Sequence, residues 1–277
     1  MTDIFTPDAV RQIFPPALTS LPLTILAETS STNTLARQAG EAGAPHGTVF
    51  AAASQTAGRG RRGRTFCSPD GTGLYFSLLL RPEMEVSCAT RITTAAAVAL
   101  CRALESMGVT DTSVKWVNDI FRGGRKIAGI LTEISFTPDA KMRYAVLGVG
   151  VNLYPPAGGF PPEIADIAGA AWDQPIESGR ARLLAAFLTE FFALYDTLSA
   201  AEASHMEEYR RRCFVLGQPI TVIPTGGLPS YDAVAEGIDE ECRLQIRLPD
   251  GRTDTLSTGE VSVRAQKNPA VRERISE

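Results

Sequence analysis

Short apolar runs alternate with longer helix-forming segments through the first half of the chain, which limits the folds open to it. The runs LTILA (23–27), GTVFAAA (47–53) and LYFSLLL (74–80) have the length of buried strands, and the alanine-rich segment at about 90–107 is typical of a buried helix. Further strands are expected at 112–117, 126–134 and 143–152, and further helices at about 7–14, after Ser30, at about 179–199 and at about 202–212. We therefore predict an α/β (α+β) domain in which helices pack on a mixed sheet.

The sequence changes character after Cys213. Short strand-like segments follow at 219–223, 231–238, 243–248, 253–258 and 260–264, separated by Gly, Pro and Asp turns. This spacing predicts a small, closed β-barrel. A chain of 277 residues is long enough for one large and one small domain. We expect an N-terminal tail at 1–20, a large domain at 21–212 and the barrel domain at 213–277.

Composition restricts the possible functions. The formal net charge of −4 and the pI near 5.4 argue against a broad nucleic-acid-binding face, which is normally basic. Two histidines and five cysteines without a C-x-x-C motif suggest neither a zinc site nor a disulfide framework. The chain shows no N-terminal targeting pattern and no apolar run of 18 residues, so we expect a cytoplasmic protein without a membrane segment.

The segment GRGRRGR (58–64) concentrates four arginines in a chain of negative net charge. Its glycine spacing matches a dinucleotide-binding fingerprint, but the next residues, TFCSPDGTG, do not open the helix that this fingerprint requires, and no Walker motif occurs. An arginine–glycine RNA-binding segment is normally longer, and a solvated basic turn is the plain alternative. Interleaved glycines and guanidinium groups favour a loop that folds over a small phosphorylated ligand.

Three further motifs have both a structural and a functional interpretation. Lys126 begins a strand just after the GG turn at 123–124, so its ammonium group is expected near the arginine loop, although a lone lysine is more often a surface residue. Asn118 and Asp119 either end a strand in a turn or face a ligand. The glycines of GVG (148–150) mark either a bulge or a strand that a ligand covers.

Taken together, the motifs resemble those of the biotin protein ligases, specifically the type without an N-terminal DNA-binding domain. They are, in order, STN (31–33), QTAGRGRRGR (55–64), VKWVND (114–119), RKIAGILTE (125–133) and GVGVN (148–152). In the predicted barrel, GID (237–239) and TGEVSVR (258–264) resemble the C-terminal domain of that family, which implies a Src-homology-3-like β-barrel. The resemblance therefore covers residues 23–264.

This resemblance implies the two-step reaction of a biotin–[acetyl-CoA-carboxylase] ligase. Biotin and ATP, with Mg²⁺, give biotinyl-adenylate and pyrophosphate, and a lysine of a biotin carboxyl carrier domain then attacks the mixed anhydride. The implied partner is the carrier domain of biotin-dependent carboxylases, and we expect no binding to DNA and no association with a membrane. Whether the protein forms a homodimer is left open. The protein's work is to hold two anions together, neutralise developing charge and exclude water.

Position within the motifs implies a role for each of a set of residues. Those implied to contact biotin are Ser31, Thr32, Asn33, Gln55, Gly58, Arg59, Lys126, Gly129, Leu131, Gly148 and Gly150. Those implied to contact ATP or the adenylate are Arg61, Arg64, Phe66, Asn118, Lys126 and Asn152. The residues implied to act in catalysis are Lys126, Arg61, Arg59 and Asn118, and Asp119 is implied to meet magnesium through the nucleotide.

Two residues depart from the family pattern. Phe66 stands where many members have tryptophan, so ring stacking is kept while an indole hydrogen bond is lost. Val117 replaces a common proline, which relaxes the backbone restriction before Asn118. The neighbouring Trp116 is expected to be a core residue rather than a ligand contact.

Two other functions compete with biotin ligation. Lipoate ligases are fold relatives that activate a different acid, but they usually lack the arginine-rich form of GRGRRGR. A biotin-responsive DNA-binding regulator needs an added N-terminal domain, and only about twenty residues precede the first expected strand. We therefore expect the ligase function.

Overall fold

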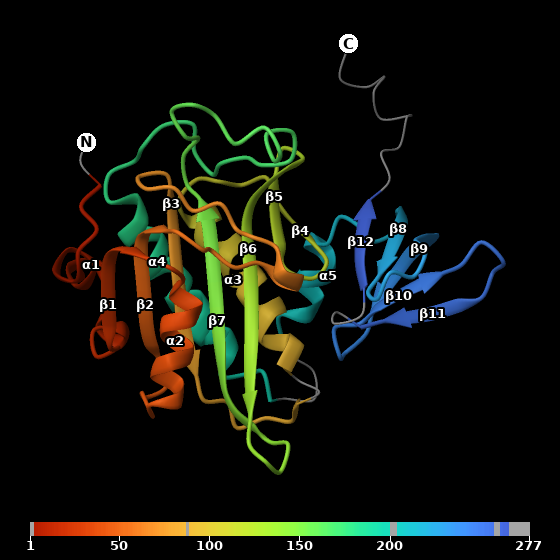
Figure 1. Ribbon diagram of the computed structural model, residues 1–277, viewed down its shortest axis with the longest axis horizontal. Coiled ribbons are helices and arrows are strands. Elements are labelled where there is room, and N and C mark those ends of the chain that lie inside the picture. Colours follow the sequence, from red (N-terminus) through yellow and green to blue (C-terminus); the bar gives the residue numbers. More distant parts are fainter. Residues whose placement is uncertain (1–2, 87–88, 200–203, 258–260, 266–277) are drawn as a thin grey trace.

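The computed structural model describes residues 3–86, 89–199, 204–257 and 261–265 (Figure 1). Its main element is a seven-stranded sheet in the order β1-β2-β3-β7-β6-β5-β4, which confirms the predicted mixed α/β domain. In this sheet β1 and β2 run parallel and the other neighbouring pairs run antiparallel. The strands are β1 (Leu23–Thr29), β2 (Thr48–Gln55), β3 (Gly73–Leu80), β4 (Thr112–Lys115), β5 (Asp119–Arg122), β6 (Arg125–Phe136) and β7 (Met142–Asn152).

Helices cover both faces of this sheet. Figure 1 shows α2 (Thr32–Glu41) in front of the sheet, and α3 (Ala89–Ser106) with α4 (Gly179–Tyr195) behind it. Strand β3 is buried along its whole length, with Phe76 in the core under α3 and α4 and Leu79 in a smaller cluster under α2. A strand that is buried on both sides needs a layer on each side. Within the described ranges, none of the helices has the length and apolar character needed to cross a membrane.

The N-terminal segment, predicted as a tail, packs onto the large domain. It forms α1 (Pro7–Ile13), the helix expected at about 7–14, and a 3₁₀ turn at Pro16–Leu18. Val10, Phe14 and Leu18 are buried in the main core. The segment therefore adds apolar contacts to the fold although it is too short to be a domain of its own.

The predicted strand at 112–117 is wrong at its end. Strand β4 stops at Lys115, residues 116–118 form a turn, and the unpredicted strand β5 follows. Lys115 pairs with Asp119 across the resulting hairpin. The tryptophan and valine of the turn favour strands by propensity, yet both are buried in the core, where tertiary packing decides their conformation. Trp116 is thus buried in the core, as predicted, and it also lines the main cavity of the structure.

The other elements of the large domain agree with the prediction apart from their ends. The GG turn at 123–124 joins β5 to β6. Strand β7 passes through GVG (148–150) without a register shift there, so these glycines do not mark a bulge. Helix α4 ends at Tyr195, before the predicted end at 199, and turns follow it. Helix α5 spans Met206–Arg212, and residues 202 and 203 of its predicted range lie outside the described part.

The C-terminal strands form a separate antiparallel sheet in the order β11-β10-β9-β8-β12 (Figure 1). They are β8 (Pro219–Pro224), β9 (Tyr231–Ile238), β10 (Leu244–Arg247), β11 (Thr253–Leu256) and β12 (Val261–Ala265), which confirms the predicted strands. Strands β11 and β12 are its edges, so the described residues show no ladder that closes the predicted barrel. Residues 258–260 of the TGEVSVR motif and residues 266–277 lie outside the described part.

Candidate active site

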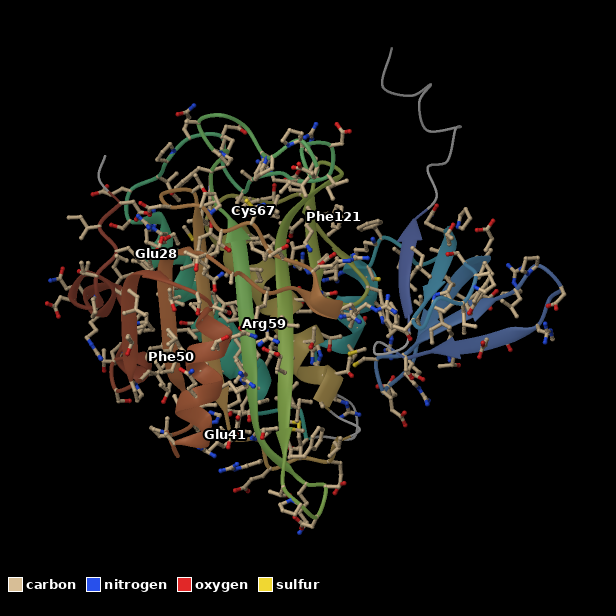
Figure 2. All side chains as sticks on the ribbon, in the orientation of Figure 1. Glu28, Glu41, Phe50, Arg59, Cys67 and Phe121 are labelled. Carbon is tan, nitrogen blue, oxygen red and sulfur yellow. The ribbon has the colours of Figure 1, made fainter. Side chains whose placement is uncertain are left out.

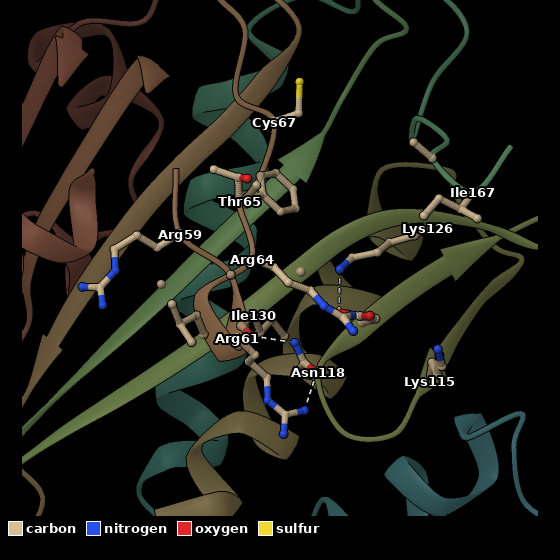
Figure 3. Close-up of a pocket in the computed structure, with 18 of the residues that line it drawn as sticks. Arg59, Arg61, Arg64, Thr65, Cys67, Lys115, Asn118, Lys126, Ile130 and Ile167 are labelled. Carbon is tan, nitrogen blue, oxygen red and sulfur yellow. Dashed lines mark hydrogen bonds and ion pairs between the residues drawn. The ribbon is translucent and has the colours of Figure 1, made fainter. Parts of the chain in front are cut away.

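A cavity of about 1100 Å³ opens between the arginine loop, the central strands and the C-terminal sheet (Figure 3). The predicted site residues that line it are Ser31, Thr32, Asn33, Gln55, Arg59, Arg61, Arg64, Phe66, Asn118, Asp119, Lys126, Gly129, Leu131, Gly148, Gly150 and Asn152. Gly58 is not part of this wall and lies at the base of the loop, where its carbonyl accepts a hydrogen bond from the Phe66 N–H at 2.9 Å. The fold therefore brings the motifs together in one place.

One half of the cavity is a recess of hydrogen-bonded polar side chains around the start of α2. The backbone N–H of Thr32 donates to Gln55 Oε1 at 2.9 Å. The Ser77 hydroxyl on β3 lies 2.8 Å from Thr32 Oγ1 and 2.6 Å from Asn33 Oδ1. All three of these hydroxyl and amide side chains are buried. Because buried, mutually satisfied polar groups hold one another in place, this polar recess is organised without a ligand.

Glycines on the central strands form the floor beside the polar recess. A Cβ on Gly148 would overlap Asn33 Oδ1, and a Cβ on Gly150 would lie 2.7 Å from Phe66 Cε1. Close approach of a side chain to the strand therefore explains glycine at both positions. The Phe66 ring lies against this floor, and Lys126 Nζ is 5.9 Å from the ring centroid.

The arginine loop is a short hairpin with a 3₁₀ turn, η2 (Arg61–Gly63), at its tip. The Gly60 N–H donates to the Arg64 carbonyl at 2.7 Å, next to the Phe66-to-Gly58 bond that closes its base. Figure 3 shows that the arginine side chains leave this hairpin in different directions. The loop therefore spreads its positive charge around the cavity instead of stacking it on one side.

Arg59 lies over the central strands of the main sheet (Figure 2). Its guanidinium group contacts the Glu133 carboxylate twice, with Nη2–Oε1 at 2.9 Å and Nη1–Oε2 at 3.3 Å. Glu133 Oε2 also accepts a hydrogen bond from Asn33 Nδ2 at 2.8 Å. One carboxylate on β6 thus joins the arginine loop to the polar recess.

Arg61 is directed to the opposite side, against the β4–β5 turn (Figure 3). Its Nη1 donates to Asn118 Oδ1 at 2.9 Å, and Asn118 Nδ2 donates to the Ile130 carbonyl at 2.9 Å. Burial lowers the pKa of Arg61, and the nearby Asp119 carboxylate opposes this effect. Arginine nevertheless stays protonated in proteins, so a partly desolvated cation faces the cavity.

Lys126 reaches the cavity from the start of β6. Its Nζ lies 2.7 Å from Asp119 Oδ1 on β5. The lysine therefore lines the cavity and is not an isolated surface charge. An anion that enters the cavity would take the place of the Asp119 carboxylate as the partner of the Lys126 ammonium group.

The donor set limits which metal fits here. Among the described residues no group of three or more His, Cys, Asp and Glu forms a metal site. Asp119 lines the cavity beside Lys126. Mg²⁺ commonly combines one or two protein carboxylates with substrate phosphates and water. Asp119 therefore suits a magnesium ion that arrives with a nucleotide.

The segment that follows β7 contributes to the site, and sequence reasoning missed it. The Lys126 N–H donates to the Ile167 carbonyl at 2.7 Å, and Asn152 Nδ2 donates to a backbone carbonyl of the same segment at 3.0 Å. Ile164 and Ile167 line the cavity, and Ile167 is 58% exposed. The prolines at 155–162 indicate a loop but carry no signal for a ligand contact.

Other contributors were also missed, with different signals in the sequence. Ser77 is a serine inside the apolar run LYFSLLL, and a polar residue in such a strand indicates a buried network. Glu133 ends the motif RKIAGILTE, where its charge was available as a signal. Thr221, Ile223 and Asp232 of the C-terminal sheet line the cavity, and no motif marks them.

The fold and site together define a class of protein, namely an α/β ligand-binding domain with a cationic loop, followed by a small antiparallel domain. The model of the biotin/lipoate A/B protein ligase family matches residues 25–152. The model of the biotin protein ligase C-terminal domain matches residues 215–264. The two matches coincide with the main sheet and with the C-terminal sheet.

Individual relatives agree with these matches. A biotin–[acetyl-CoA-carboxylase] ligase of Paracoccus denitrificans is 34% identical over 82% of this chain and 95% of its own length. The bifunctional ligase/repressor BirA of Bacillus subtilis is 40% identical, but the match spans 50% of this chain and only 42% of that protein. The structure of the biotin protein ligase from Aquifex aeolicus in complex with biotin and ATP has a TM-score of 0.75 and 25% identity, covering 88% of this chain and 99% of that one. The chain belongs to the biotin protein ligase family.

Proposed function

We propose that this protein activates biotin with ATP to form biotinyl-adenylate and transfers the biotinyl group to a lysine of a biotin carboxyl carrier domain. The observation that carries the proposal is the cavity itself, in which a buried polar recess with a glycine floor adjoins Arg61 and Lys126 on separate elements. A hydrogen-bonding ring and a phosphate-bearing group fit such a cavity end to end. The names of the Paracoccus and Aquifex relatives support the same assignment.

In the first step a carboxylate oxygen of biotin attacks the α-phosphorus of ATP, the bond from this phosphorus to the bridging oxygen breaks, and pyrophosphate leaves. Lys126 neutralises charge between the two anions, and Arg59 and Arg61 hold the product. Asn118 orients Arg61 through their 2.9 Å hydrogen bond. The protein needs no covalent nucleophile because both reacting groups belong to the substrates.

The remaining residues bind and orient the two substrates. The recess residues Ser31, Thr32, Asn33 and Gln55 contact the ureido ring of biotin, with Gly129, Leu131, Gly148 and Gly150 around it. Arg64, Phe66 and Asn152 contact the nucleotide, and Asp119 is the carboxylate available to nucleotide-bound magnesium. That ion, when bound, supplies further neutralisation of phosphate charge.

In the second step the neutral amine of the carrier lysine attacks the acyl carbon, the acyl–oxygen bond to AMP breaks, and the amine nitrogen releases a proton to solvent. We assign this chemistry to residues 21–212 and the smaller domain to residues 213–277, a division supported by the two sheets and the two family matches. Use of ATP, together with the free thiols of Cys67, Cys101, Cys213 and Cys242, supports a cytoplasmic location.

ATP–pyrophosphate exchange tests the first step and separates biotin from lipoate. We expect exchange that depends on biotin and does not occur with lipoate. Exchange with lipoate alone would replace the proposal with a lipoate ligase. Mass spectrometry of an acetyl-CoA carboxylase carrier domain after incubation with biotin and ATP tests the second step, and a carrier without the biotinyl mass would contradict transfer.

A further inference from the structure

The β4–β5 turn that presents Asn118 is held by two hydrogen bonds from outside the cavity. The indole Nε1 of Trp116 donates to the carbonyl of Cys242, in the turn between β9 and β10 of the C-terminal sheet, at 3.0 Å. The Tyr209 hydroxyl on α5 donates to the carbonyl of Val117 at 3.0 Å. Both bonds therefore act on the two residues that directly precede Asn118.

These contacts are buried. Tyr209 and Cys242 are each 0% exposed, and Trp116 is 4% exposed. Burial raises the pKa of Tyr209 well above 10, so its hydroxyl stays protonated and remains a donor. Buried hydrogen bonds are strong in a low dielectric, and a carbonyl that loses its only donor there is destabilised. The turn is therefore fixed from this side with little freedom to move.

The opposite side of the turn is fixed by β6. The Asn118 carbonyl accepts from the Ile130 N–H at 2.9 Å, and Asn118 Nδ2 donates to the Ile130 carbonyl at 2.9 Å. With its Nδ2 and backbone engaged, the side chain presents Oδ1 to Arg61 (Figure 3). The direction of the Asn118–Arg61 bond thus depends on where the turn lies between β6 and α5.

Helix α5 is itself tied to both neighbouring parts of the protein. Figure 1 shows it between the main sheet and the C-terminal sheet. Arg210 Nε donates to the carbonyl of Ile238 on β9 at 2.8 Å. Arg212 Nη2 donates to Glu105 Oε2 on α3 at 2.8 Å. The helix that carries Tyr209 therefore cannot shift without breaking contacts on both sides.

We infer that Tyr209 and the Cys242 turn are positioning elements for the Asn118–Arg61 pair. Tyr209 is not among the residues that line the cavity and acts through Val117, while the C-terminal sheet acts through the Trp116 indole. The small domain and α5 thereby set the geometry of the nucleotide side of the cavity. This inference rests on the proposed function, in which Asn118 and Arg61 hold the activated intermediate.

The positioning role predicts a particular kinetic change. Tyr209→Phe removes one hydroxyl and keeps the ring, and we expect it to lower kcat for pyrophosphate exchange by about tenfold. The KM for biotin should change by less than about twofold, because the polar recess is not touched. The matched control is Tyr144→Phe, which removes a buried phenol whose hydroxyl donates to Glu41 Oε1 at 2.6 Å, on α2 and not at the β4–β5 turn. This control should keep wild-type kcat.

A double-mutant cycle separates positioning from general destabilisation. If Tyr209 acts through Asn118, Tyr209→Phe should lower kcat by less than about twofold in an Asn118→Ala background. An equal loss in both backgrounds, or an unchanged kcat in the single variant, would overturn the inference. If thermal unfolding shows that Tyr209→Phe does not fold, Trp116→Phe is used in its place. The Trp116→Phe variant deletes the indole donor and keeps an aromatic ring.

Hydrogen exchange of residues 114–120 in the ligand-free protein gives a readout that does not depend on activity. Tyr209→Phe should speed exchange in this segment by about tenfold, and Tyr144→Phe should leave it unchanged. An unchanged segment in Tyr209→Phe would also overturn the inference. If the wild-type protein showed no biotin-dependent pyrophosphate exchange, this result would contradict the proposed function instead. The hydrogen-exchange measurement would still decide the positioning role.

Discussion

The two halves of the cavity are built in opposite ways. In the polar recess, Thr32, Asn33 and Ser77 are buried and hydrogen-bonded to one another and to neighbouring side chains. On the anion side, Arg59 and Lys126 are partly exposed and contact protein carboxylates at 2.9 and 2.7 Å. The recess is complete as it stands, whereas the cations hold internal partners that an anionic ligand can replace.

This difference has a thermodynamic consequence. A preformed recess binds a ring without a cost for ordering its side chains, so it serves recognition. We expect a loop whose charges must exchange partners to be ordered further by its ligand, so it serves to close over an intermediate. Under the proposed function, the recess therefore provides selectivity for biotin, and the loop retains the adenylate.

The largest effect is expected when the fixed cation is removed. Lys126→Ala should lower biotin-dependent pyrophosphate exchange by at least about 100-fold, because charge at the reacting phosphate is no longer neutralised. The fold should survive, since Lys126 lies on the cavity wall and not in the core. Lys141→Ala, whose side chain is 81% exposed, is the control. Normal exchange in Lys126→Ala would remove the residue from the mechanism.

A second substitution tests retention by the loop. Arg61→Gly loses one charge-assisted hydrogen bond, which should cost about 1.5–3 kcal/mol of adenylate binding, or roughly 10- to 150-fold. The escaping mixed anhydride should then acylate lysines of serum albumin incubated with the variant, biotin and ATP. Arg252→Gly removes the same charge from the β10–β11 turn, where the side chain is 76% exposed and does not line the cavity, and should not label albumin. If albumin stays unlabelled while the variant makes and retains the adenylate as wild type does, Arg61 is not the residue that retains the adenylate.

A third substitution tests the recess. Gly148→Ala places a methyl group against Asn33, and we expect the KM for biotin to rise about tenfold while the KM for ATP stays nearly constant. Gly158→Ala is the control, because a Cβ there has no neighbour within 4 Å. A rise in both KM values would mean that the two halves of the cavity are not separable.

The smallest effect concerns Glu133, which contacts both halves. Glu133→Gln keeps an acceptor for Asn33 but removes the charge that holds Arg59. Because a partly exposed ion pair contributes about 0.2–1 kcal/mol, the KM for biotin should fall by up to about fivefold as Arg59 becomes available. Steady-state kinetics against Glu133→Ala, which also loses the Asn33 contact, separates the two roles. A raised KM in Glu133→Gln would make Glu133 a support of the recess and not a competitor for Arg59.

The sequence predicted most of the fold, and the predicted site residues apart from Gly58 line one cavity, because local patterns indicate both. Strands such as LYFSLLL are apolar through their length, and the motif residues Asn118 and Lys126 lie where the hairpin turns of the main sheet place them. The turn at 116–118 was missed because its apolar residues favour strands by propensity, while tertiary contacts from Tyr209 and Cys242 fix them in a turn.

The contributions that sequence reasoning missed come from segments without a motif. Ile167 reaches Lys126 through a backbone carbonyl, and any residue type supplies such a carbonyl. Thr221 and Asp232 meet the cavity only because the C-terminal sheet packs beside it. Such contacts depend on how distant elements pack, which a local pattern does not record.

Hydrogen exchange of the ligand-free and ligand-bound protein tests the contrast between the two halves most directly. The recess peptides at 30–34 and 148–152 should be protected without ligand and should change little when biotin and ATP are added. The loop at 55–68 should exchange quickly without ligand and gain at least about tenfold protection with biotin plus ATP, since its like charges gain an anion to order them. A loop equally protected in both states, or a recess that becomes protected only with ligand, would contradict the account.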